Sequence, residues 1–308
     1  MRTSTPISPS LLLLLCACAD PSRGAVTTST ESAASAGTTD ATSTTDATST
    51  TGATDATGST TAPDSTTSTD THEPAPLGFV EDFEAHRPGA FPGAPWEDIA
   101  MRIDAPTVPP PTAIVVERDG PDGAATRALQ TVDAIGSSQG AYARIEPDVA
   151  YHRLEADVLV EQFSDAVGAT RWPIAVGFSQ EGPGDDVNAD PHAVVYPYHD
   201  GQWYLFVFQG SKPGFNFPIP GVSVQLGQWV RVIVEVAPET RTYQATIEDP
   251  TSGEILGQRH ETLEAVDPAK ARYDAVAFYD GEYEVSAGSL GGVAAIDNVV
   301  YTASLSRP

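Results

Sequence analysis

Apolar and polar residues alternate over short stretches from about residue 78 to the end of the chain. Between residues 229 and 236 every second residue is a valine, and residues 154–161 follow a similar rule. A period of two places successive side chains on opposite faces of a strand, so each strand has one buried and one wetter face. Ten further stretches rich in Val, Ile, Tyr, Phe and Trp are also predicted to be strands: 79–84, 112–117, 126–132, 140–146, 172–179, 192–198, 203–209, 241–248, 272–279 and 294–302.

These twelve short strands, separated by turn residues at antiparallel spacing, predict an all-β domain over residues 78–308. A domain of this kind buries its strands in a two-sheet antiparallel sandwich. Asp200 and Gly201 stand between two apolar strands, and this pair suits the positive φ values of a hairpin turn. No segment has a long helical period, and only residues 261–271 are expected to contain one short helix.

Five short motifs resemble those of concanavalin A-like lectin/glucanase jelly rolls, including laminin-G-like modules of bacterial surface proteins. The resemblance covers nearly all of residues 78–308 and implies a jelly-roll sandwich whose first and last strands lie side by side. That pairing would bring Asp82 close to Asp297. The motifs are FVEDFE at 79–84, TRALQ at 126–130, GQWVRV at 227–232, TYQAT at 242–246 and AIDNVV at 295–300.

Residues 1–18 resemble a bacterial lipoprotein signal peptide. The apolar run Leu11–Leu15 is too short to span a bilayer, and it precedes a cysteine-containing segment. The lipobox pattern favours Cys18 as the lipidated residue, with Cys16 as the alternative; an ordinary secretory signal cleaved near Ala19 remains open. The sequence therefore predicts an exported lipoprotein of the cell envelope, on the outer membrane or cell surface, that contacts the membrane only through its lipid anchor.

Residues 19–77 form a Thr/Ser/Asp/Ala-rich tract that repeats the sequence TTDATS. Such a composition buries too little apolar surface to offset its ordering entropy, so the tract is predicted to be a disordered linker. The chain is thus expected to consist of the signal peptide (1–18), the linker (19–77) and the sandwich domain (78–308). Both cysteines precede the linker, so the domain can form no disulfide.

The charge of the domain limits its partners. The chain has a formal net charge of −26, and residues 78–308 contain 34 acidic and 14 basic residues. A negative field of this size repels nucleic acids and polyanionic sugars. A neutral glycan or cell-surface polysaccharide, a protein and divalent cations remain as partners, and the domain is expected to be a monomer.

Catalytic motifs are sparse in this sequence. The Glu-x-Asp-x-x-Glu strand of the superfamily's glucanases does not occur, and the nearest carboxylate pairs are Glu282 with Glu284 and Glu81 with Glu84. Tyr151 and Arg153 share a strand face and are residue types that a polysaccharide lyase uses, but the negative field disfavours a uronate substrate. A glycoside hydrolase or polysaccharide lyase of the same fold is therefore kept as the alternative to a non-catalytic protein.

Two sets of oxygen ligands suggest a structural Ca²⁺ ion. Asp186, Asn188 and Asp190 have the alternate spacing that opens many calcium loops, although the rest of the EF-hand pattern is missing. Asp82 and Asp297 form the second candidate, because terminal acids of related sandwiches often bind an ion.

Aromatic residues crowd the predicted hairpin at 192–209. Tyr198 and Trp203 flank its turn, His199 lies in the turn, and Trp172 begins the predicted strand before the hairpin. Exposed rings stack on the apolar faces of sugars while polar groups bind hydroxyls. The sequence therefore favours a non-catalytic glycan-binding domain with Tyr198, His199, Trp203 and Trp172 at its site, and leaves an adhesion module that binds protein as a further alternative.

Overall fold

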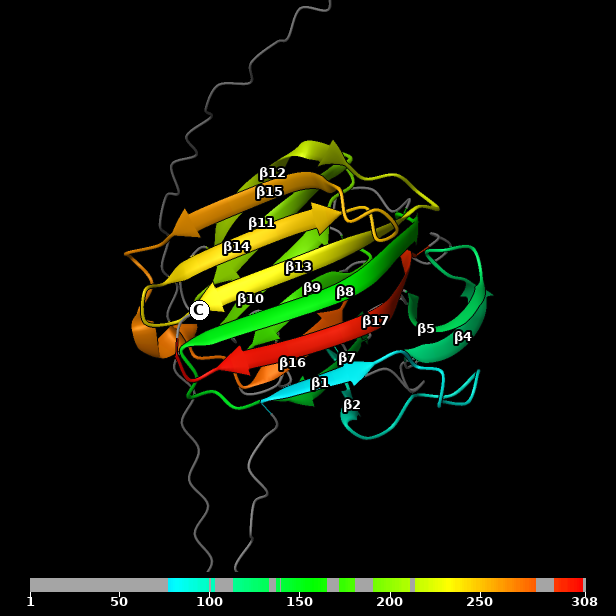
Figure 1. Ribbon diagram of the computed structural model, residues 1–308, viewed down its shortest axis with the longest axis horizontal. Coiled ribbons are helices and arrows are strands. Elements are labelled where there is room, and N and C mark those ends of the chain that lie inside the picture. Colours follow the sequence, from blue (N-terminus) through cyan, green and yellow to red (C-terminus); the bar gives the residue numbers. More distant parts are fainter. Residues whose placement is uncertain are drawn as a thin grey trace, which may run out of the picture. The chain divides into compact units, whose positions relative to one another are not determined.

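The computed structural model describes residues 77–99, 101–102, 113–132, 137–138, 140–164, 172–180, 191–210, 214–280 and 291–306 (Figure 1). The chain divides into two units, Met1–Thr67 and Ser68–Pro308, and every described residue belongs to the second unit. No helix among these residues is long and apolar enough to cross a membrane.

The larger of the two main sheets, sheet A, is antiparallel, and β8 (Tyr151–Gln162) is the middle strand of its order. The first strand of the domain, β1, pairs with the last strand, β17, as the resemblance implied. The order across sheet A is β15 (Ile255–Thr262), β14 (Thr242–Glu248), β13 (Trp229–Ala237), β8 (Tyr151–Gln162), β17 (Val293–Ser304), β5 (Ala125–Val132) and β4 (Ile114–Asp119), with β1 (Gly78–Glu81) on the same side of β17 as β5.

Sheet B is also antiparallel and packs against sheet A. Its order is β12 (Phe215–Ser223), β11 (Gln202–Phe208), β10 (His192–Pro197), β9 (Ala175–Ser179), β16 (Ala275–Tyr279), β7 (Gly140–Arg144) and β2 (Trp96–Asp98). Two short strands, β3 (Met101–Arg102) and β6 (Ser137–Ser138), pair separately. The predicted all-β, two-sheet antiparallel sandwich is confirmed.

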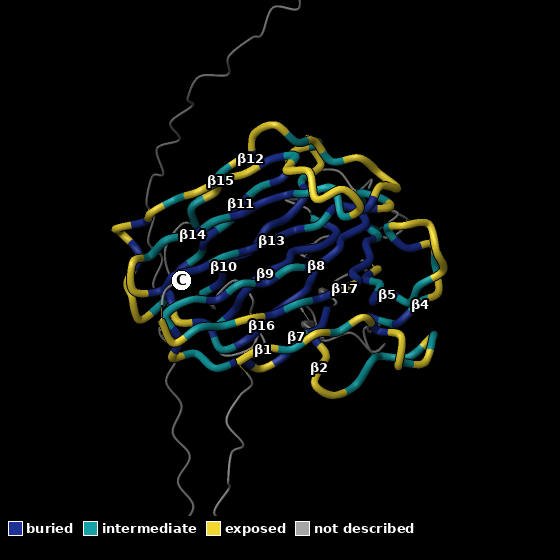
Figure 2. The backbone as a smooth tube through the Cα atoms, viewed as in Figure 1, coloured by how far each residue is buried: buried dark blue, intermediate teal, exposed yellow. Residues whose placement is uncertain are grey.

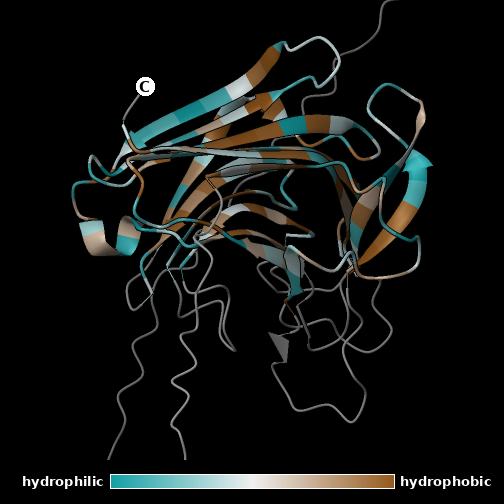
Figure 3. Ribbon diagram, turned by 60° about the horizontal axis from the view of Figure 1, so that its bottom comes forward, coloured by the Kyte–Doolittle hydropathy of each residue, from teal (hydrophilic) through white to brown (hydrophobic). Residues whose placement is uncertain are grey.

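The hydrophobic core lies between the sheets and follows the period-two pattern. The alternate valines of β13, from Val230 to Val236, face inward together with Leu154, Ala156 and Val158 of β8. Figure 2 shows that buried residues follow the central strands, whereas the turns are largely exposed. Figure 3 shows the same division as hydrophobic strands joined by mostly hydrophilic turns.

The short helix expected within 261–271 is a single 3₁₀ turn, Pro268–Ala271. The Asp267 side chain caps it by accepting a hydrogen bond of 3.1 Å from the Ala269 N–H. At the start of the expected helix range, Glu261 and Thr262 belong to the edge strand β15.

The strands of the sandwich end at two opposite poles. At the linker pole, the Ala303 N–H donates a 2.8 Å hydrogen bond to the Leu77 carbonyl, so the first described residue lies beside the C-terminal strand. At the distal pole, the Gly227 N–H donates to the Val160 carbonyl near the other end of β8, at 2.9 Å. The β12–β13 connection, which contains Gly227, therefore lies at the distal pole.

Candidate functional site

Aromatic side chains from β10 and β11 meet on the outer face of sheet B. The β10–β11 register places Tyr196 opposite Tyr204, and the ring centroids of these two residues lie 5.6 Å apart at 16°. Trp172 packs on Tyr196 at 4.4 Å. Tyr198 and Phe206 contact the same ring edge-on. We call Trp172, Tyr196, Tyr198, Tyr204 and Phe206 the aromatic face.

The rings of the aromatic face differ in exposure. Tyr196 is only 3% exposed and forms the base of the cluster, whereas the other four rings are partly exposed. Burial is the main cause that raises the pKa of Tyr196, so this phenol stays neutral. Partly exposed aromatic rings that pack over a buried one form a rigid apolar surface. Such a surface loses little side-chain entropy when a ligand binds to it.

Polar groups border the aromatic face at the β10–β11 turn. Asp200 accepts hydrogen bonds from the Gln202 N–H at 2.9 Å and from the Tyr204 hydroxyl at 2.7 Å. The hydrogen bond to Asp200 is the largest cause that raises the pKa of Tyr204. On the neighbouring edge strand β12, the exposed Asn216 lies opposite Phe206 in the β11–β12 register, so its amide borders the same face. Carboxylate, amide and phenol groups thus lie next to apolar rings.

The predicted ligand residues of the hairpin separate in the structure. Tyr198 belongs to the aromatic face, and the exposed His199 lies against it with a ring distance of 4.1 Å. Trp172, which was also predicted at the site, belongs to the aromatic face as well. Trp203 does not: it points between the sheets and is 1% exposed, so it belongs to the core and is not available to a surface ligand.

Asp82 and Asp297 do not share a site in the structure. Asp82 is exposed and accepts a hydrogen bond from the Glu84 N–H at 3.1 Å. Asp297 is 1% exposed and accepts from the Thr126 hydroxyl at 2.8 Å and from the Asn298 N–H at 2.7 Å. The same Thr126 hydroxyl lies 2.9 Å from the Glu84 carboxylate. The acidic residue that shares a hydrogen-bond partner with Asp297 is therefore Glu84 and not Asp82.

An arginine holds the segment that follows β1. The Arg127 guanidinium donates to the backbone carbonyl of Glu84 at 2.5 Å and to that of His86 at 3.2 Å. The Arg127 N–H also donates to the Glu84 carboxylate at 2.8 Å. The charged guanidinium thus fixes the segment that follows β1 through two of its carbonyl oxygens.

The described residues do not fit calcium bound between Asp82 and Asp297. Both oxygens of Asp297 already accept protein hydrogen bonds, and no described group of three or more His, Cys, Asp and Glu residues could hold a metal ion. Asp186, Asn188 and Asp190 lie outside the described residues, so calcium at that loop stays a prediction.

A polar pocket of about 430 Å³ lies on the outer face of sheet A. At its base, Arg231 binds both oxygens of Asp157, at 2.8 and 3.1 Å, and the Asn298 amide donates to Asp157 at 2.9 Å. Burial is the main cause that raises the pKa of neighbouring Asp297 to about 6. Asp157 has an arginine as its ion-pair partner, whereas Asp297 has only neutral hydrogen-bond donors. Each side chain is 1% exposed, so neither can reach a glycosidic bond.

Tyr151 and Arg153 meet on the same face of sheet A, as the alternation predicted. Both contact Glu235, Arg153 at 2.9 Å. Burial and the hydrogen bond to Glu235 raise the pKa of Tyr151 to about 12, which opposes its use as a base near neutral pH. His152 points into the core, where burial lowers its pKa to about 4. These residues are arranged as a structural network.

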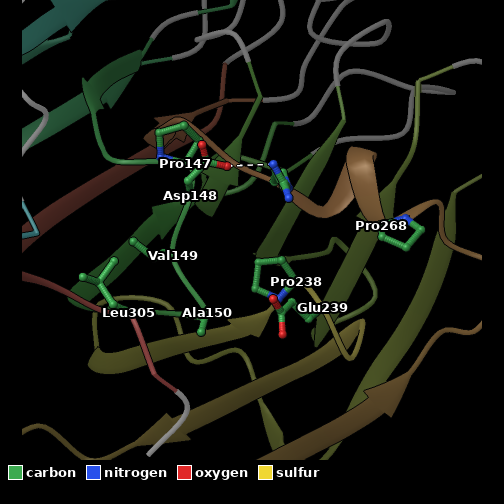
Figure 4. Close-up of a pocket in the computed structure, with 9 residues that line it drawn as sticks. Pro147, Asp148, Val149, Ala150, Pro238, Glu239, Pro268 and Leu305 are labelled. Atoms are coloured by element: carbon green, nitrogen blue, oxygen red, sulfur yellow. Dashed lines mark hydrogen bonds and ion pairs between the residues drawn. The ribbon is translucent and has the colours of Figure 1, made fainter.

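The other weak catalytic candidates, Glu282 and Glu284, lie outside the described residues, as does the lipidation candidate Cys18. A hollow of about 370 Å³ at the linker pole has no aromatic lining (Figure 4). Its walls are prolines and the exposed Leu305, with an Asp148–Arg272 ion pair of 2.7 Å at its rim. It offers no ring on which a sugar would stack.

No family model and no curated protein sequence matches the chain. A sialidase is similar in structure, with 15% identity and a TM-score of 0.44 over 74% of this chain and 19% of its own. Basic winged bean lectin, solved with Tn-antigen, has 10% identity and a TM-score of 0.44 over 74% of this chain and 98% of its own. An alginate lyase from Pseudomonas aeruginosa has 12% identity and a TM-score of 0.38 over 62% of this chain and 82% of its own.

This chain therefore spans about a fifth of the sialidase and most of the lectin and the lyase. By name the three neighbours are a sialidase, a lectin and an alginate lyase. The likenesses are too distant to assign a function, which has to be argued from the described side chains.

Proposed function

We propose that this protein is a surface-anchored, non-catalytic lipoprotein whose sandwich domain recognises a neutral glycan. Cys18 carries the lipid, and residues 19–77 hold the domain away from the membrane. The aromatic face, bordered by Asp200 and Asn216, is the binding surface.

The observation that supports this proposal is the clustering of partly exposed rings next to hydrogen-bonding groups. Trp172, Tyr198, Tyr204 and Phe206 surround one buried tyrosine, and the Asp200 carboxylate lies 2.7 Å from the Tyr204 hydroxyl. A sugar ring offers a flat apolar C–H face and a rim of hydroxyls. The aromatic face offers the complementary combination of flat rings and a polar edge.

The negative charge of the domain favours a neutral ligand over an anionic one. The sandwich domain has 20 more acidic than basic residues, and the residue that borders the exposed rings at the turn is Asp200. A uronate or sulfated sugar would lose binding free energy through repulsion, whereas a hydroxyl can donate to the Asp200 carboxylate.

The described residues give less support to a glycan-cleaving enzyme. Asp157 and Asp297 are buried and hydrogen-bonded, and the Tyr151 network is engaged with Glu235. An enzyme would release reducing ends or unsaturated sugars from the polysaccharide it binds, whereas a binding domain leaves the chain length unchanged. Product analysis on every polysaccharide that binds therefore separates the two functions.

The test uses the full chain with Cys16→Ser and Cys18→Ser, so that it stays in solution. It is applied to an array of neutral, uronate-containing and sulfated glycans, with calcium and with EDTA. We expect binding to neutral glycans only. Trp172→Ala and Tyr204→Ala should each weaken it about tenfold or more, because each ring contributes about 1.4 kcal/mol or more.

Tyr151→Ala is the matched control, because this tyrosine is also partly exposed but lies on sheet A. Its glycan affinity should equal that of the parent chain. Equal losses for Tyr151→Ala and Tyr204→Ala would reject the aromatic face as the site. Absence of any glycan binding would reject the function and favour an adhesion module for protein. A calcium-dependent signal would support an ion at residues 186–190.

A further inference from the structure

We propose that the polar pocket on the outer face of sheet A is a second binding site, and that it takes a neutral sugar residue. This pocket lies on the sheet opposite the aromatic face, and the proposal does not depend on glycan binding there. A domain that holds a sugar on each of its two sheets can link two glycan chains.

Two turns build the walls of the pocket. The β4–β5 hairpin reaches across the outer face of sheet A, where the Asp119 carbonyl accepts a 3.0 Å hydrogen bond from the Trp229 indole of β13. The β14–β15 turn meets this hairpin, because the Thr251 hydroxyl donates to the Pro121 carbonyl at 3.3 Å. These contacts enclose about 430 Å³, and an adjoining hollow of about 330 Å³ shares Pro121 and Thr251 and includes Trp229. Both volumes fall in the range of small-molecule sites, about 300–1,000 Å³.

A β-bulge brings two consecutive residues of β17 to the floor of the pocket. The β8–β17 register shifts between Asp297 and Val300, and Asn298 has a φ of 49°. Consecutive residues of a regular strand point to opposite faces, yet Asp297 and Asn298 both line the pocket. Bulges redirect side chains in this way, and they are frequent beside functional sites.

Arg231 is fixed at the floor with one nitrogen left over. Its Nε and Nη2 bind the two oxygens of Asp157, to which the Asn298 amide also donates. No described residue accepts a hydrogen bond from Nη1 of Arg231, and this side chain is 30% exposed. Asp157 thus positions two donor side chains while it stays out of reach itself. A guanidinium held in this way loses little side-chain entropy when it donates to a ligand.

The other open groups of the pocket include acceptors. Among the described residues, no donor reaches the Asn298 amide oxygen or the second carboxylate oxygen of Asp122. The hydroxyls of a sugar residue both donate and accept, so they match a guanidinium beside an amide and a carboxylate. The rings of Pro121 and Pro250 offer an apolar wall to its C–H groups.

Charge disfavours ions of both signs in this pocket. A cation finds only Asp122 within reach, beside the positive Arg231, because Asp157 and Asp297 are each 1% exposed. An anion would meet three carboxylates and one guanidinium among the described lining residues. A neutral ligand with many hydroxyls avoids both penalties.

The test observes the two sheets separately by NMR. It uses the full chain with Cys16→Ser and Cys18→Ser and follows two indole N–H signals. Trp229 reports on the pocket, and Trp172 reports on the aromatic face. The probes are glucose, mannose, galactose and xylose, each as the monosaccharide and as a linear trisaccharide. Sodium acetate and ethylammonium chloride serve as charged controls.

We expect at least one neutral sugar to shift the Trp229 signal saturably, and neither charged control to do so. Asn298→Gly removes the amide and keeps the positive φ of the bulge, so it should weaken this binding about five- to tenfold. Gln258→Ala is the matched control: it removes an amide that donates to Thr246 on the same face, outside the pocket. Its affinity should equal that of the parent chain.

Three results would each overturn the second site: no Trp229 shift with any neutral sugar, a shift caused by acetate or ethylammonium, or unchanged affinity in Asn298→Gly. Urea midpoints show whether the variants are folded, and the titration of the parent chain decides the question if Asn298→Gly is not.

Tyr204→Ala separates the second site from the proposed function. It should abolish the Trp172 response and leave the Trp229 response. Loss of both responses would mean that the Trp229 shift is transmitted from the aromatic face, which would overturn the second site. A Trp172 signal that no glycan shifts, together with a responding Trp229, would instead overturn the proposed function and leave the second site standing.

Discussion

Asp297 lies directly opposite Asp157 in the β8–β17 pairing, and only Asp157 has an arginine as its partner. Both side chains are 1% exposed, and Arg231 binds Asp157 through two nitrogens. Asp297 accepts only neutral donors, from Thr126 and from the Asn298 backbone. A buried carboxylate without a positive partner favours its protonated form, which is the main reason that the pKa of Asp297 rises to about 6.

Asp297→Asn is expected to remove a stability loss that develops between pH 4 and pH 6. The native state binds the Asp297 proton more tightly than the unfolded chain, so its contribution is full below pH 4 and is lost as the pH rises through 6. A shift of about two pKa units corresponds to roughly 3 kcal/mol. Urea denaturation at pH 7 should find the variant at least as stable as the parent.

The asparagine keeps both hydrogen bonds, since its oxygen accepts from Asn298 and its amide donates to Thr126. The same measurement in EDTA and in calcium serves as the control for an ion at Asp297. If the variant is less stable than the parent at pH 7 in calcium but not in EDTA, Asp297 binds an ion. That result would contradict the interpretation of Asp297 as a buried carboxylate without a positive partner.

His152 is expected to oppose Asp297 over the same pH range. Burial lowers its pKa to about 4, so the native state binds its proton less tightly than the unfolded chain. Stability is therefore lost as the pH falls from 6.5 towards 4, by up to about 3 kcal/mol. This loss should be clearest in Asp297→Asn, and a direct NMR titration of the imidazole checks the pKa. A His152 pKa near 6.5 would show that the ring is hydrated.

Arg231→Met is expected to destabilise the domain by about 2–3 kcal/mol, because it leaves the Asp157 charge buried without its ion-pair partner. The double variant Asp157→Asn, Arg231→Met should recover most of that loss, since no buried charge remains. Urea midpoints of the three chains provide the comparison. A loss below about 0.5 kcal/mol for Arg231→Met would mean that water reaches Asp157.

Arg127→Met is expected to cost about 1–2 kcal/mol, because the carbonyls of Glu84 and His86 lose a charged donor. Arg272→Met is the matched control: its ion pair with Asp148 is mostly exposed, so its loss should stay below about 0.5 kcal/mol. The cost of Arg127→Met should be the same in calcium and in EDTA. Rescue by calcium would place an ion beside Glu84.

The sequence predicted the strands that alternate clearly. β8 and β13 were found because their inward positions are apolar throughout, and the pairing of β1 with β17 followed from the family resemblance. The edge strands β2, β12 and β15 and the short pair β3 and β6 were missed. β12 contains Pro218 and Pro220, which normally argue against a strand, and β15 has a polar outer face. Edge strands need less apolar surface and fewer ladder hydrogen bonds, so they leave a weaker pattern.

The candidate site was predicted only in part. Trp203 and Tyr204 are neighbours in sequence and therefore lie on opposite faces of β11, but alternation cannot say which face is the core, and Trp203 was placed at the ligand site. Asp157 stands among outward positions of β8, so no local pattern indicated that it is buried. Its burial comes from turns far away in sequence, which only the folded chain brings together.

The pairing of β1 with β17 has a mechanical consequence. Leu77 is attached at one end of β1, and a ligand held near Asp200 pulls on the opposite end of the domain. The load then runs lengthwise along the strands, and the hydrogen bonds from Gly78 to Glu81 resist sliding all at once. Pulling across the strands would instead break them one after another. Under the proposed function, a load between tether and ligand would thus strain β1 in the direction in which that strand is strongest.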